Sequence, residues 1–312
     1  MENCTAIGTL GVFIGIVFTI IIIIIILVSF YYYKRNSFII GYNDALKEYC
    51  QSLPDPSYRE SVYIPSQIDI YEKNLATALL DISLATSQSY CRNIDPLPLP
   101  PGFTKDFPLY GRDPSGGKLT MFAHIFYNPD THIACFSFTG TMNLPEWRDD
   151  FSFKLVEANV LNNYKKGVKC HKGFYGIYKS IRSLLWNWFE LEKNNIEYLF
   201  ITGHSLGGAL STIAMYDFAN TMPNIIHYSF AAPRSGNVEY SKIFDNNNPQ
   251  SLRICNTEDI VPTLPPPVIG QNVYEQTLNL VSFTKNLGSL VKNHVDSYIY
   301  FMPDCFNNKA PC

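Results

Sequence analysis

The hydrophobic positions of this chain are distributed unevenly, with one long apolar run before a remainder of mixed character. Residues 6–33 contain no charged side chain, whereas about 20 helical residues are enough to cross a hydrocarbon core of about 30 Å. A cleavable signal peptide is the alternative, but it begins with basic residues and has a shorter apolar stretch. The run therefore predicts an N-terminal transmembrane anchor, followed by Lys34 and Arg35 at the membrane interface.

After the anchor, short β-forming runs and segments of helical periodicity follow one another. The apolar run at 196–202 (IEYLFIT) is typical of a parallel strand that is covered on both faces, and further strands are predicted at 131–140, 225–230 and 252–255. Helices are predicted over 206–220 and 173–193. The apolar side of the second helix is expected to consist of Phe174, Ile177, Ile181, Leu184, Leu185, Trp188 and Phe189.

The remainder after the anchor, about 280 residues, suits one large domain better than two small ones. We find no internal repeat. Prolines near residues 55 and 97 exclude a helix or a central strand there, so both stretches are predicted to be loops or extended lead-in segments.

The stretch Gly203-His204-Ser205-Leu206-Gly207 joins the predicted strand at 196–202 to the predicted helix at 206–220. A serine on so tight a turn has a strained backbone, so the residues two places before and after it must be small, as the two glycines are. The turn would raise the hydroxyl to a helix N-terminus, where backbone N–H groups favour the negative charge of a reacting carbonyl oxygen. The pattern predicts that Ser205 is a nucleophile.

A serine nucleophile needs a base, usually a histidine that a carboxylate orients. Of the two histidines that follow Ser205, His227 lies in the predicted strand 225–230 and is expected to be a packed core residue, so His294 is the predicted base. Asp259 follows the strand at 252–255 and is the predicted acid. His204 is set aside because neighbouring side chains on a sharp turn diverge. The alternative acids that stay open are Glu258, Asp296 and Asp245.

The charge pattern excludes one class of partner. The net charge is −3 and no run of Lys or Arg exceeds two residues, whereas nucleic-acid binding needs a clustered basic face. The sequence contains neither an HExxH motif nor paired CxxC motifs, so no metal site is predicted. No cofactor is predicted, because the proposed hydrolysis needs none.

The ordered blocks around these residues resemble the fungal-type class 3 lipases. The blocks are TSQSYCR (86–92), FTGT (138–141), EWRDD (146–150), CHKGF (170–174), GHSLGGA (203–209), FAAPRSGN (230–237), DIVPTLPP (259–266) and HVDSY (294–298). The resemblance implies an α/β-hydrolase fold with Ser205, Asp259 and His294 as a catalytic triad. It divides the chain into the anchor (1–33), a lead-in segment with the start of the first helix (34–83) and a lipase-like domain (84–312).

The resemblance also assigns groups around the nucleophile. Thr141 and the backbone N–H of Leu206 would form the oxyanion hole, although Thr139 replaces an arginine that is common before the intervening glycine. His171 would have a structural role that supports the site. The segment 141–151 would be a lid, and an ordinary amphipathic helix packed on the core is the alternative. The apolar face of this segment consists of Leu144, Trp147 and Phe151.

Cys91 and Cys305 match two positions that form a disulfide in related lipases, so the resemblance implies a bond between them. A disulfide indicates an oxidising compartment and a domain outside the cytosol. Lys34 and Arg35 favour a cytoplasmic domain, and the domain contains no N-x-S/T site, whereas Asn3 begins one. The side of the membrane on which the domain lies stays open.

Together these features predict a membrane-anchored serine hydrolase that cleaves carboxylic ester bonds of lipids through an acyl-enzyme, with an acylglycerol as the expected substrate. The expected partners are the lipid ester and the bilayer, because a tether keeps the enzyme at high local concentration on its substrate. The alternative is a lipase-like protein without turnover that binds a lipid or another partner.

Overall fold

The computed structural model describes residues 49–62, 71–92, 97–112, 119–140 and 153–306. The chain divides into two units, Met1–Ala45 and Leu46–Cys312. The predicted anchor at 6–33 and the predicted lid at 141–151 both lie outside the described residues. Within the described part of the chain, no helix has the length and apolarity that a bilayer crossing requires.

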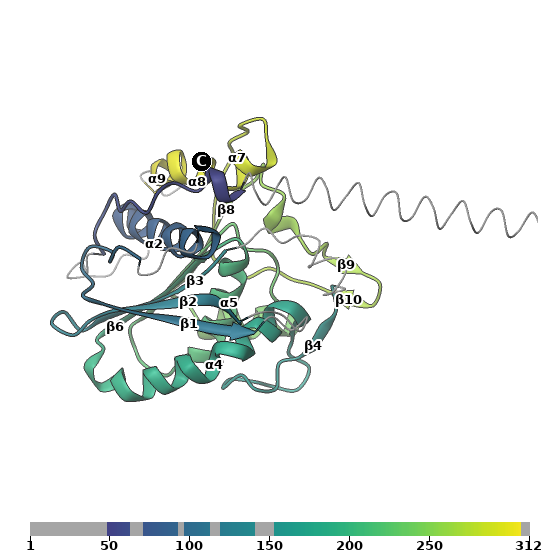
Figure 1. Ribbon diagram of the computed structural model, residues 1–312. Coiled ribbons are helices and arrows are strands. Elements are labelled where there is room, and N and C mark those ends of the chain that lie inside the picture. Colours follow the sequence, from purple (N-terminus) through teal and green to yellow (C-terminus); the bar gives the residue numbers. More distant parts are fainter. Residues whose placement is uncertain (1–48, 63–70, 93–96, 113–118, 141–152, 307–312) are drawn as a thin grey trace, which may run out of the picture. The chain divides into compact units, whose positions relative to one another are not determined.

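A seven-stranded sheet forms the centre of the second unit, in the order β1-β2-β3-β6-β7-β8-β11 (Figure 1). The first three strands pair antiparallel, and the strands from β3 onward pair parallel. The bounds are β1 (Lys105–Arg112), β2 (Leu119–Asn128), β3 (Ile133–Phe138), β6 (Tyr198–His204), β7 (Ile225–Phe230), β8 (Ser251–Asn256) and β11 (Leu280–Phe283). Two small antiparallel pairs lie outside this sheet, β4 (Leu155–Glu157) with β5 (Lys169–His171) and β9 (Val268–Ile269) with β10 (Asn272–Val273).

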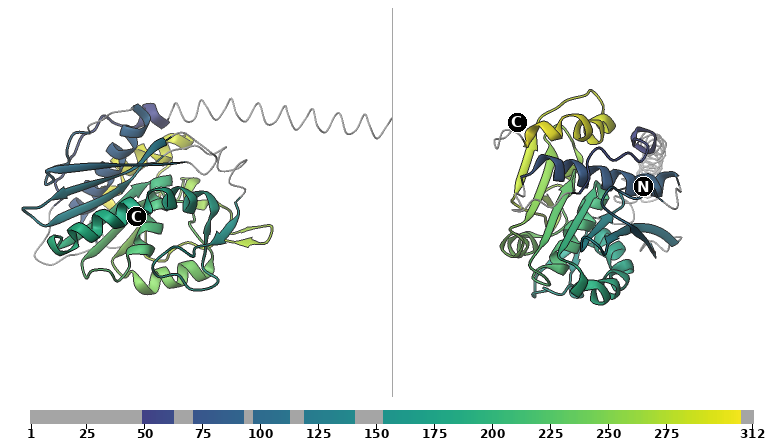
Figure 2. Two further views of the ribbon diagram at one scale, coloured as in Figure 1. Left: turned by 60° about the horizontal axis from the view of Figure 1, so that its bottom comes forward. Right: turned by 90° about the vertical axis from the view of Figure 1, so that its left-hand side faces the viewer.

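Helices cover both faces of the sheet (Figure 2). One face carries α2 (Lys73–Arg92) with α8 (Asp296–Tyr300) and α9 (Met302–Cys305). The other face carries α4 (Lys172–Glu192), α5 (Leu206–Phe218) and α6 (Val238–Asn247). The short α7 (Leu290–His294) follows β11, and two 3-10 turns span Lys193–Asn195 and Val261–Thr263. The arrangement is an α/β-hydrolase fold with a mostly parallel central sheet.

The hydrophobic core has two parts, one on each face of the sheet, because the side chains of each strand alternate between the two faces. In β3, Ala134, Phe136 and Phe138 belong to the cluster beneath α4 and α5, whereas Ile133 and Cys135 belong to the cluster beneath α2. Successive side chains of a strand point to opposite faces, so a strand covered on both sides is buried along its whole length and is mostly apolar, with a few polar residues such as Ser137 and His227. All six residues of β3 and all six of β7 are buried.

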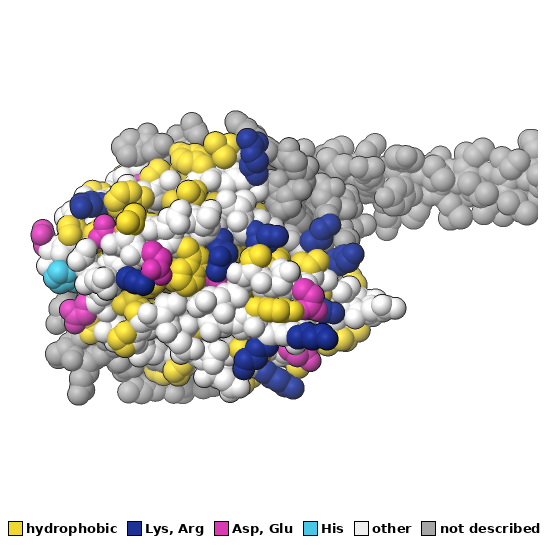
Figure 3. Space-filling model, turned by 90° about the horizontal axis from the view of Figure 1, so that it is seen from below, with side chains coloured by type: hydrophobic (Ala, Val, Ile, Leu, Met, Phe, Trp, Pro, Cys, Tyr) yellow, Lys and Arg dark blue, Asp and Glu magenta, His cyan; other side chains and the backbone are white. Residues whose placement is uncertain are grey.

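The predicted elements agree with most of the observed ones. The strand predicted at 225–230 is β7, and the helix predicted at 173–193 is α4 to within one residue. Leu184, however, is 42% exposed, whereas Tyr175 and Tyr178 are buried, so the buried face of α4 is shifted around the helix from the predicted one. On the α4 side of the molecule, charged side chains of both signs are interspersed with apolar ones (Figure 3).

The folded unit includes part of the predicted lead-in segment, which was expected to contain the start of the first helix. The predicted boundary at residue 84 falls in the middle of α2, and the compact unit begins at Leu46. Residues Tyr49 and Leu53, from the predicted lead-in segment, are buried in the cluster beneath α2. Part of the lead-in is therefore core.

The predicted disulfide is wrong. Cys91 is bonded to Cys50, with a Cα–Cα distance of 5.5 Å, and Cys305 lies on α9 with its Sγ 3.7 Å from the carbonyl oxygen of Phe301. The physical reason is the buried lead-in segment, which brings Cys50 to the C-terminal end of α2. The bond therefore ties the first described residues to α2, and not α2 to the C-terminal helices.

Asp217, at the end of α5, is a fully buried carboxylate with donors from several elements. It accepts hydrogen bonds of 2.7 Å from Tyr178 Oη, Arg182 Nε and Trp186 Nε1, all on α4. It also accepts one of 2.5 Å from the backbone N–H of Asn162. A buried charge is tolerated only when it is paired and hydrogen-bonded, and here those partners join α4 to α5.

Asp217→Ala is therefore expected to lower the free energy of unfolding by about 3–5 kcal/mol, because it leaves a partly buried guanidinium and several donors without an acceptor. Lys193→Ala, which removes a surface ion pair with Glu190, is the matched control and should cost less than about 1 kcal/mol. Urea denaturation of both variants measures the difference. Equal losses would show that the Asp217 cluster does not join the two helices.

Candidate active site

Ser205 occupies a tight turn between β6 and α5, as the sequence predicts for this pattern. Its backbone is strained, with φ 59° and ψ −125°, and its N–H donates to the carbonyl oxygen of Phe230 at 2.9 Å. A Cβ on Gly203 would lie 2.2 Å from the carbonyl oxygen of Gly207, and one on Gly207 would lie 2.2 Å from that of Phe138. Glycine is therefore required on both sides of the serine.

The carboxyl ends of three parallel strands bring the predicted triad to one edge of the sheet. Ser205 follows β6, Asp259 follows β8, and His294 ends α7, which follows β11. His294 Nδ1 is 2.8 Å from Asp259 Oδ2. The other carboxylate oxygen, Oδ1, accepts the backbone N–H of Val261 at 3.0 Å, so the carboxylate has a fixed orientation.

The remaining polar atoms of the serine and the histidine have no partner. Among the described residues, neither Ser205 Oγ nor His294 Nε2 has a hydrogen-bond partner, and the two atoms do not bond to each other. Both residues have zero exposure. Burying an unsatisfied polar atom costs free energy, and such exceptions call for an explanation. In unliganded enzymes, catalytic hydrogen bonds are often long and tighten only when substrate binds.

The three alternative acids do not contact His294. Glu258 is exposed and its Oε2 accepts from Asn286 Nδ2 at 3.0 Å. Asp245 Oδ1 accepts the backbone N–H of Leu278 at 2.9 Å. Asp296 begins α8, and burial raises the pKa of its carboxyl; within the described part of the chain, the carboxylate bonded to the imidazole is that of Asp259. The geometry therefore favours Asp259.

Tyr298, for which the sequence predicted no role, is part of this site. Its hydroxyl donates to Asp259 Oδ2 at 3.0 Å and accepts the backbone N–H of Asn256 at 2.9 Å. Burial and the neighbouring carboxylate raise the pKa of this phenol, so it stays protonated and donates. Tyr298 lies on α8 and His294 at the end of α7, and no motif in the sequence indicated the contact of Tyr298 with Asp259.

One of the two predicted oxyanion groups can be located. Leu206 is the first residue of α5, and the N–H groups of a helix's first turn have no acceptor inside the helix. Thr141 and the lid residues Leu144, Trp147 and Phe151 lie outside the described residues. Thr139 is fully buried, and its N–H donates to the carbonyl oxygen of Phe122 at 3.0 Å.

The other buried histidines have structural surroundings. His171 is the N-cap of α4, where its Nδ1 accepts the N–H of Phe174 at 3.3 Å. His227 lies in β7 between two serine hydroxyls, at 3.0 Å from Ser211 and 2.7 Å from Ser251, so the expectation of a packed core histidine is confirmed. Burial lowers the pKa of both His171 and His227 to about 3.

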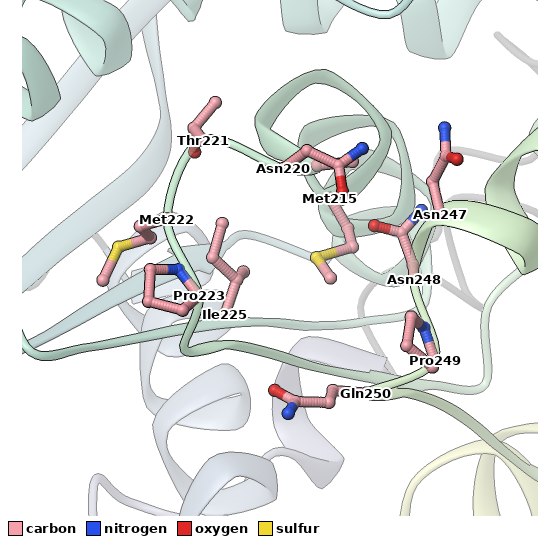
Figure 4. A pocket seen from close by; sticks show the side chains of 11 residues that line it. Met215, Asn220, Thr221, Met222, Pro223, Ile225, Asn247, Asn248, Pro249 and Gln250 are labelled. Atoms are coloured by element: carbon pink, nitrogen blue, oxygen red, sulfur yellow. The ribbon is translucent and has the colours of Figure 1, made fainter.

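A cavity of about 510 Å³ lies away from this site (Figure 4). Its lining includes Met215, Met222 and Ile225 together with Asn248 and Gln250. Met215 lies on α5 and the other four lie near the amino ends of β7 and β8, whereas Ser205 follows the carboxyl end of β6. No triad residue lines the cavity. Among the described residues, no cluster of His, Cys, Asp and Glu could hold a metal ion.

Comparison with known proteins agrees with this geometry. Residues 135–269 match the family model described as Lipase (class 3). A chloroplastic phospholipase A1 of Arabidopsis thaliana is 31% identical over 151 residues, which cover 41% of this chain and 33% of that protein. A secreted mono- and diacylglycerol lipase of Malassezia globosa is 31% identical over 164 residues, which cover 49% of this chain and 53% of that protein. The chain thus spans about a third to a half of these relatives.

Solved structures share the fold. A triacylglycerol lipase whose catalytic centre is a serine protease triad superposes with a TM-score of 0.51 at 22% identity, covering 71% of this chain and 89% of that one. A complex of Rhizomucor miehei lipase with its propeptide superposes with a TM-score of 0.53 at 22% identity, covering 70% and 69%. At this identity the likeness establishes the lipase-type α/β-hydrolase fold alone.

The buried histidines predict acid sensitivity. His171 and His227 bind a proton in the unfolded chain below about pH 6.5 but not in the folded protein until about pH 3. Between these values each should lower the free energy of unfolding by about 1.4 kcal/mol per unit fall in pH. His227→Gln should reduce the slope of stability against pH by about one proton, measured by urea denaturation between pH 4 and 6. An unchanged slope would contradict the assignment of a neutral, buried His227.

Proposed function

We propose that the protein is a serine hydrolase that cleaves carboxylic ester bonds of lipids. The observation that carries the proposal is the buried, unpaired Ser205 Oγ on a strained turn, at the same sheet edge as a histidine already held by a carboxylate. A packed core serine would instead bond to its surroundings, as Ser211 does with the carbonyl oxygen of Gly208 at 2.9 Å. The match to class 3 lipases supports the same conclusion.

In this mechanism Ser205 Oγ attacks the ester carbonyl carbon while His294 Nε2 takes the hydroxyl proton. Asp259 accepts the Nδ1–H, which orients the ring and stabilises the imidazolium that forms. His294 then gives the proton to the departing alcohol, leaving the acyl group on the serine. Water, deprotonated by the same imidazole, releases the fatty acid and restores the enzyme.

The developing oxyanion needs donors that are already in place. The N–H of Leu206 and the N-terminus of α5 supply one such donor and a favourable dipole. We assign the second donor to Thr141, on the basis of its position one residue after Gly140. Since Ser205 and His294 have no exposed surface, substrate entry requires that the groups covering them move.

The names of the relatives support a lipid ester as the substrate. The similar proteins are described as phospholipases A1 and as mono- and diacylglycerol lipases, and both groups cleave a fatty acyl ester. Our proposal therefore extends to fatty acyl esters of glycerolipids, with an acylglycerol as the expected substrate. A lipase-like binding protein without turnover would not need the strained turn or the oriented imidazole, so these features favour the enzyme.

A fluorophosphonate probe tests the nucleophile, because it reacts with an activated serine hydroxyl. The wild type is expected to be labelled, and Ser205→Ala to lose labelling and ester hydrolysis by at least about 10³-fold. Ser211→Ala is the matched control, since Ser211 is another buried serine that contacts a histidine, and its labelling should persist. Labelling that survives Ser205→Ala would refute the nucleophile, and a folded wild type that never reacts would favour the binding protein.

We also propose that residues 6–33 anchor the enzyme in a membrane. The support is the length of the uncharged run. The bond between Cys50 and Cys91 favours a domain on the oxidising side of that membrane, whereas Lys34 and Arg35 favour the other side.

Alkaline carbonate extraction tests the anchor. The full chain should stay with the membrane pellet, and a variant that begins at residue 34 should be released. Protease treatment of sealed vesicles reports the side, with protection of the domain expected for a luminal location. Release of the full chain by carbonate would show that residues 6–33 do not span the membrane.

A further inference from the structure

The rings of Tyr49, His204 and His294 lie together, with His204 next to Ser205 in the chain. Among the described residues, His204 Nδ1 and His294 Nε2 are buried without a hydrogen-bond partner, as Ser205 Oγ is. The ring centroids are 6.4 Å apart for Tyr49 and His204, 6.1 Å for Tyr49 and His294, and 4.7 Å for His204 and His294. Three of these residues are already explained by the turn and the triad, but Tyr49 comes from the lead-in segment.

Tyr49 packs against both histidines next to the nucleophile. Its ring is nearly parallel to that of His204, with an interplanar angle of 8°, and has no exposed surface. His204 Nε2 donates to the backbone carbonyl oxygen of His294 at 2.7 Å. The three rings therefore form one packed layer, in which the His294 ring is tilted 40° from that of Tyr49 and 47° from that of His204.

The Tyr49 hydroxyl reaches the end of β3. A Cβ built on Gly140 would lie 2.7 Å from Tyr49 Oη and 2.6 Å from the carbonyl oxygen of His204. The N–H of Gly140 donates to Ser87 Oγ at 2.9 Å. Burial raises the pKa of the Tyr49 phenol, and the neighbouring Ser87 opposes this shift, so the hydroxyl keeps its proton. The phenol thus lies against the residue that precedes Thr141, our second oxyanion donor.

Three contacts hold the lead-in segment that carries Tyr49. Cys50 is bonded to Cys91 at the end of α2. Gln88 Nε2, also on α2, donates to the carbonyl oxygens of Leu53 and Pro54, the latter at 2.7 Å. Further along, Arg59 Nε donates to Asp81 Oδ1 at 2.9 Å. The disulfide is adjacent to Tyr49 in sequence, so it limits how far the ring can move.

We propose that Tyr49 is a positioning residue of the hydrolase site, which the Cys50–Cys91 bond holds in place. Its ring fixes the imidazole of His294 through the layer shared with His204, and its hydroxyl supports the backbone at Gly140. Tyr49 acts through these groups and does not touch the reacting atoms. The proposal rests on the proposed function, because the role exists only if His294 is the base.

Steady-state kinetics of the full chain on one soluble ester tests the proposal. Tyr49→Leu removes the ring and should lower kcat by about 10- to 100-fold with little change in KM, because a misplaced base slows chemistry more than binding. Tyr49→Phe keeps the ring and should restore kcat to within about two- to tenfold of the wild type, since only one neutral hydrogen-bonding group is lost. Tyr58→Phe is the control, because Tyr58 lies in the same segment and its hydroxyl donates to Pro98 at 2.7 Å; its kcat should be unchanged.

The disulfide is tested by Cys50→Ser, which should lower kcat in the wild type but add nothing in the Tyr49→Leu background, because both changes free the same ring. If Tyr49→Leu does not fold, as judged by thermal melting, Tyr49→Phe and Cys50→Ser carry the test. Wild-type kcat in folded Tyr49→Leu, or in folded Cys50→Ser, would overturn the proposal. An inactive wild type that a fluorophosphonate does not label would instead overturn the proposed function itself.

Discussion

The site depends on a close approach between the turn after β6 and the end of β3. The carbonyl oxygen of Phe138 lies where a Cβ of Gly207 would be, and the carbonyl oxygen of Gly207 lies where a Cβ of Gly203 would be. This contact fixes the backbone of Ser205 relative to the end of β3, which leads to Gly140. The nucleophile and the oxyanion loop are therefore positioned by the same pair of parallel strands, before any side chain of the triad contributes.

The parallel order of the strands explains why much of the site could be predicted from the sequence. Carboxyl ends of parallel strands meet at one edge of a sheet, so residues that follow β6, β8 and β11 come together although they are far apart in the chain. The prediction of Asp259 used this rule and left the neighbouring Glu258 open, and the bond from His294 Nδ1 to Asp259 Oδ2 has the expected geometry. The need for glycine at positions 203 and 207 could also be predicted from the sequence, because it depends only on the local turn.

Features that depend on long-range packing could not be predicted in the same way. The lead-in segment had no periodic pattern, so neither the burial of Tyr49 nor the pairing of Cys50 with Cys91 followed from the sequence. The pairing of Cys91 with Cys305 that the family resemblance implied was wrong. The lead-in segment brings Cys50 to the end of α2, and Cys50 is the partner of Cys91 there. The exposure of Leu184 has the same origin, because helical spacing does not tell how wide a face the neighbouring elements cover.

The environment of His227 shows what separates a catalytic pair from a packed one. Ser211 and His227 lie 3.0 Å apart in the core, closer than many reactive pairs, yet both nitrogens of the ring are bonded and the serine lies within a regular helix. A search that used only the distance between a serine and a histidine would therefore select Ser211 and His227 as a catalytic pair. A better criterion is a buried polar atom without a hydrogen-bond partner beside a strained backbone. A serine and a histidine that only pack together, such as Ser211 and His227, do not combine these two features.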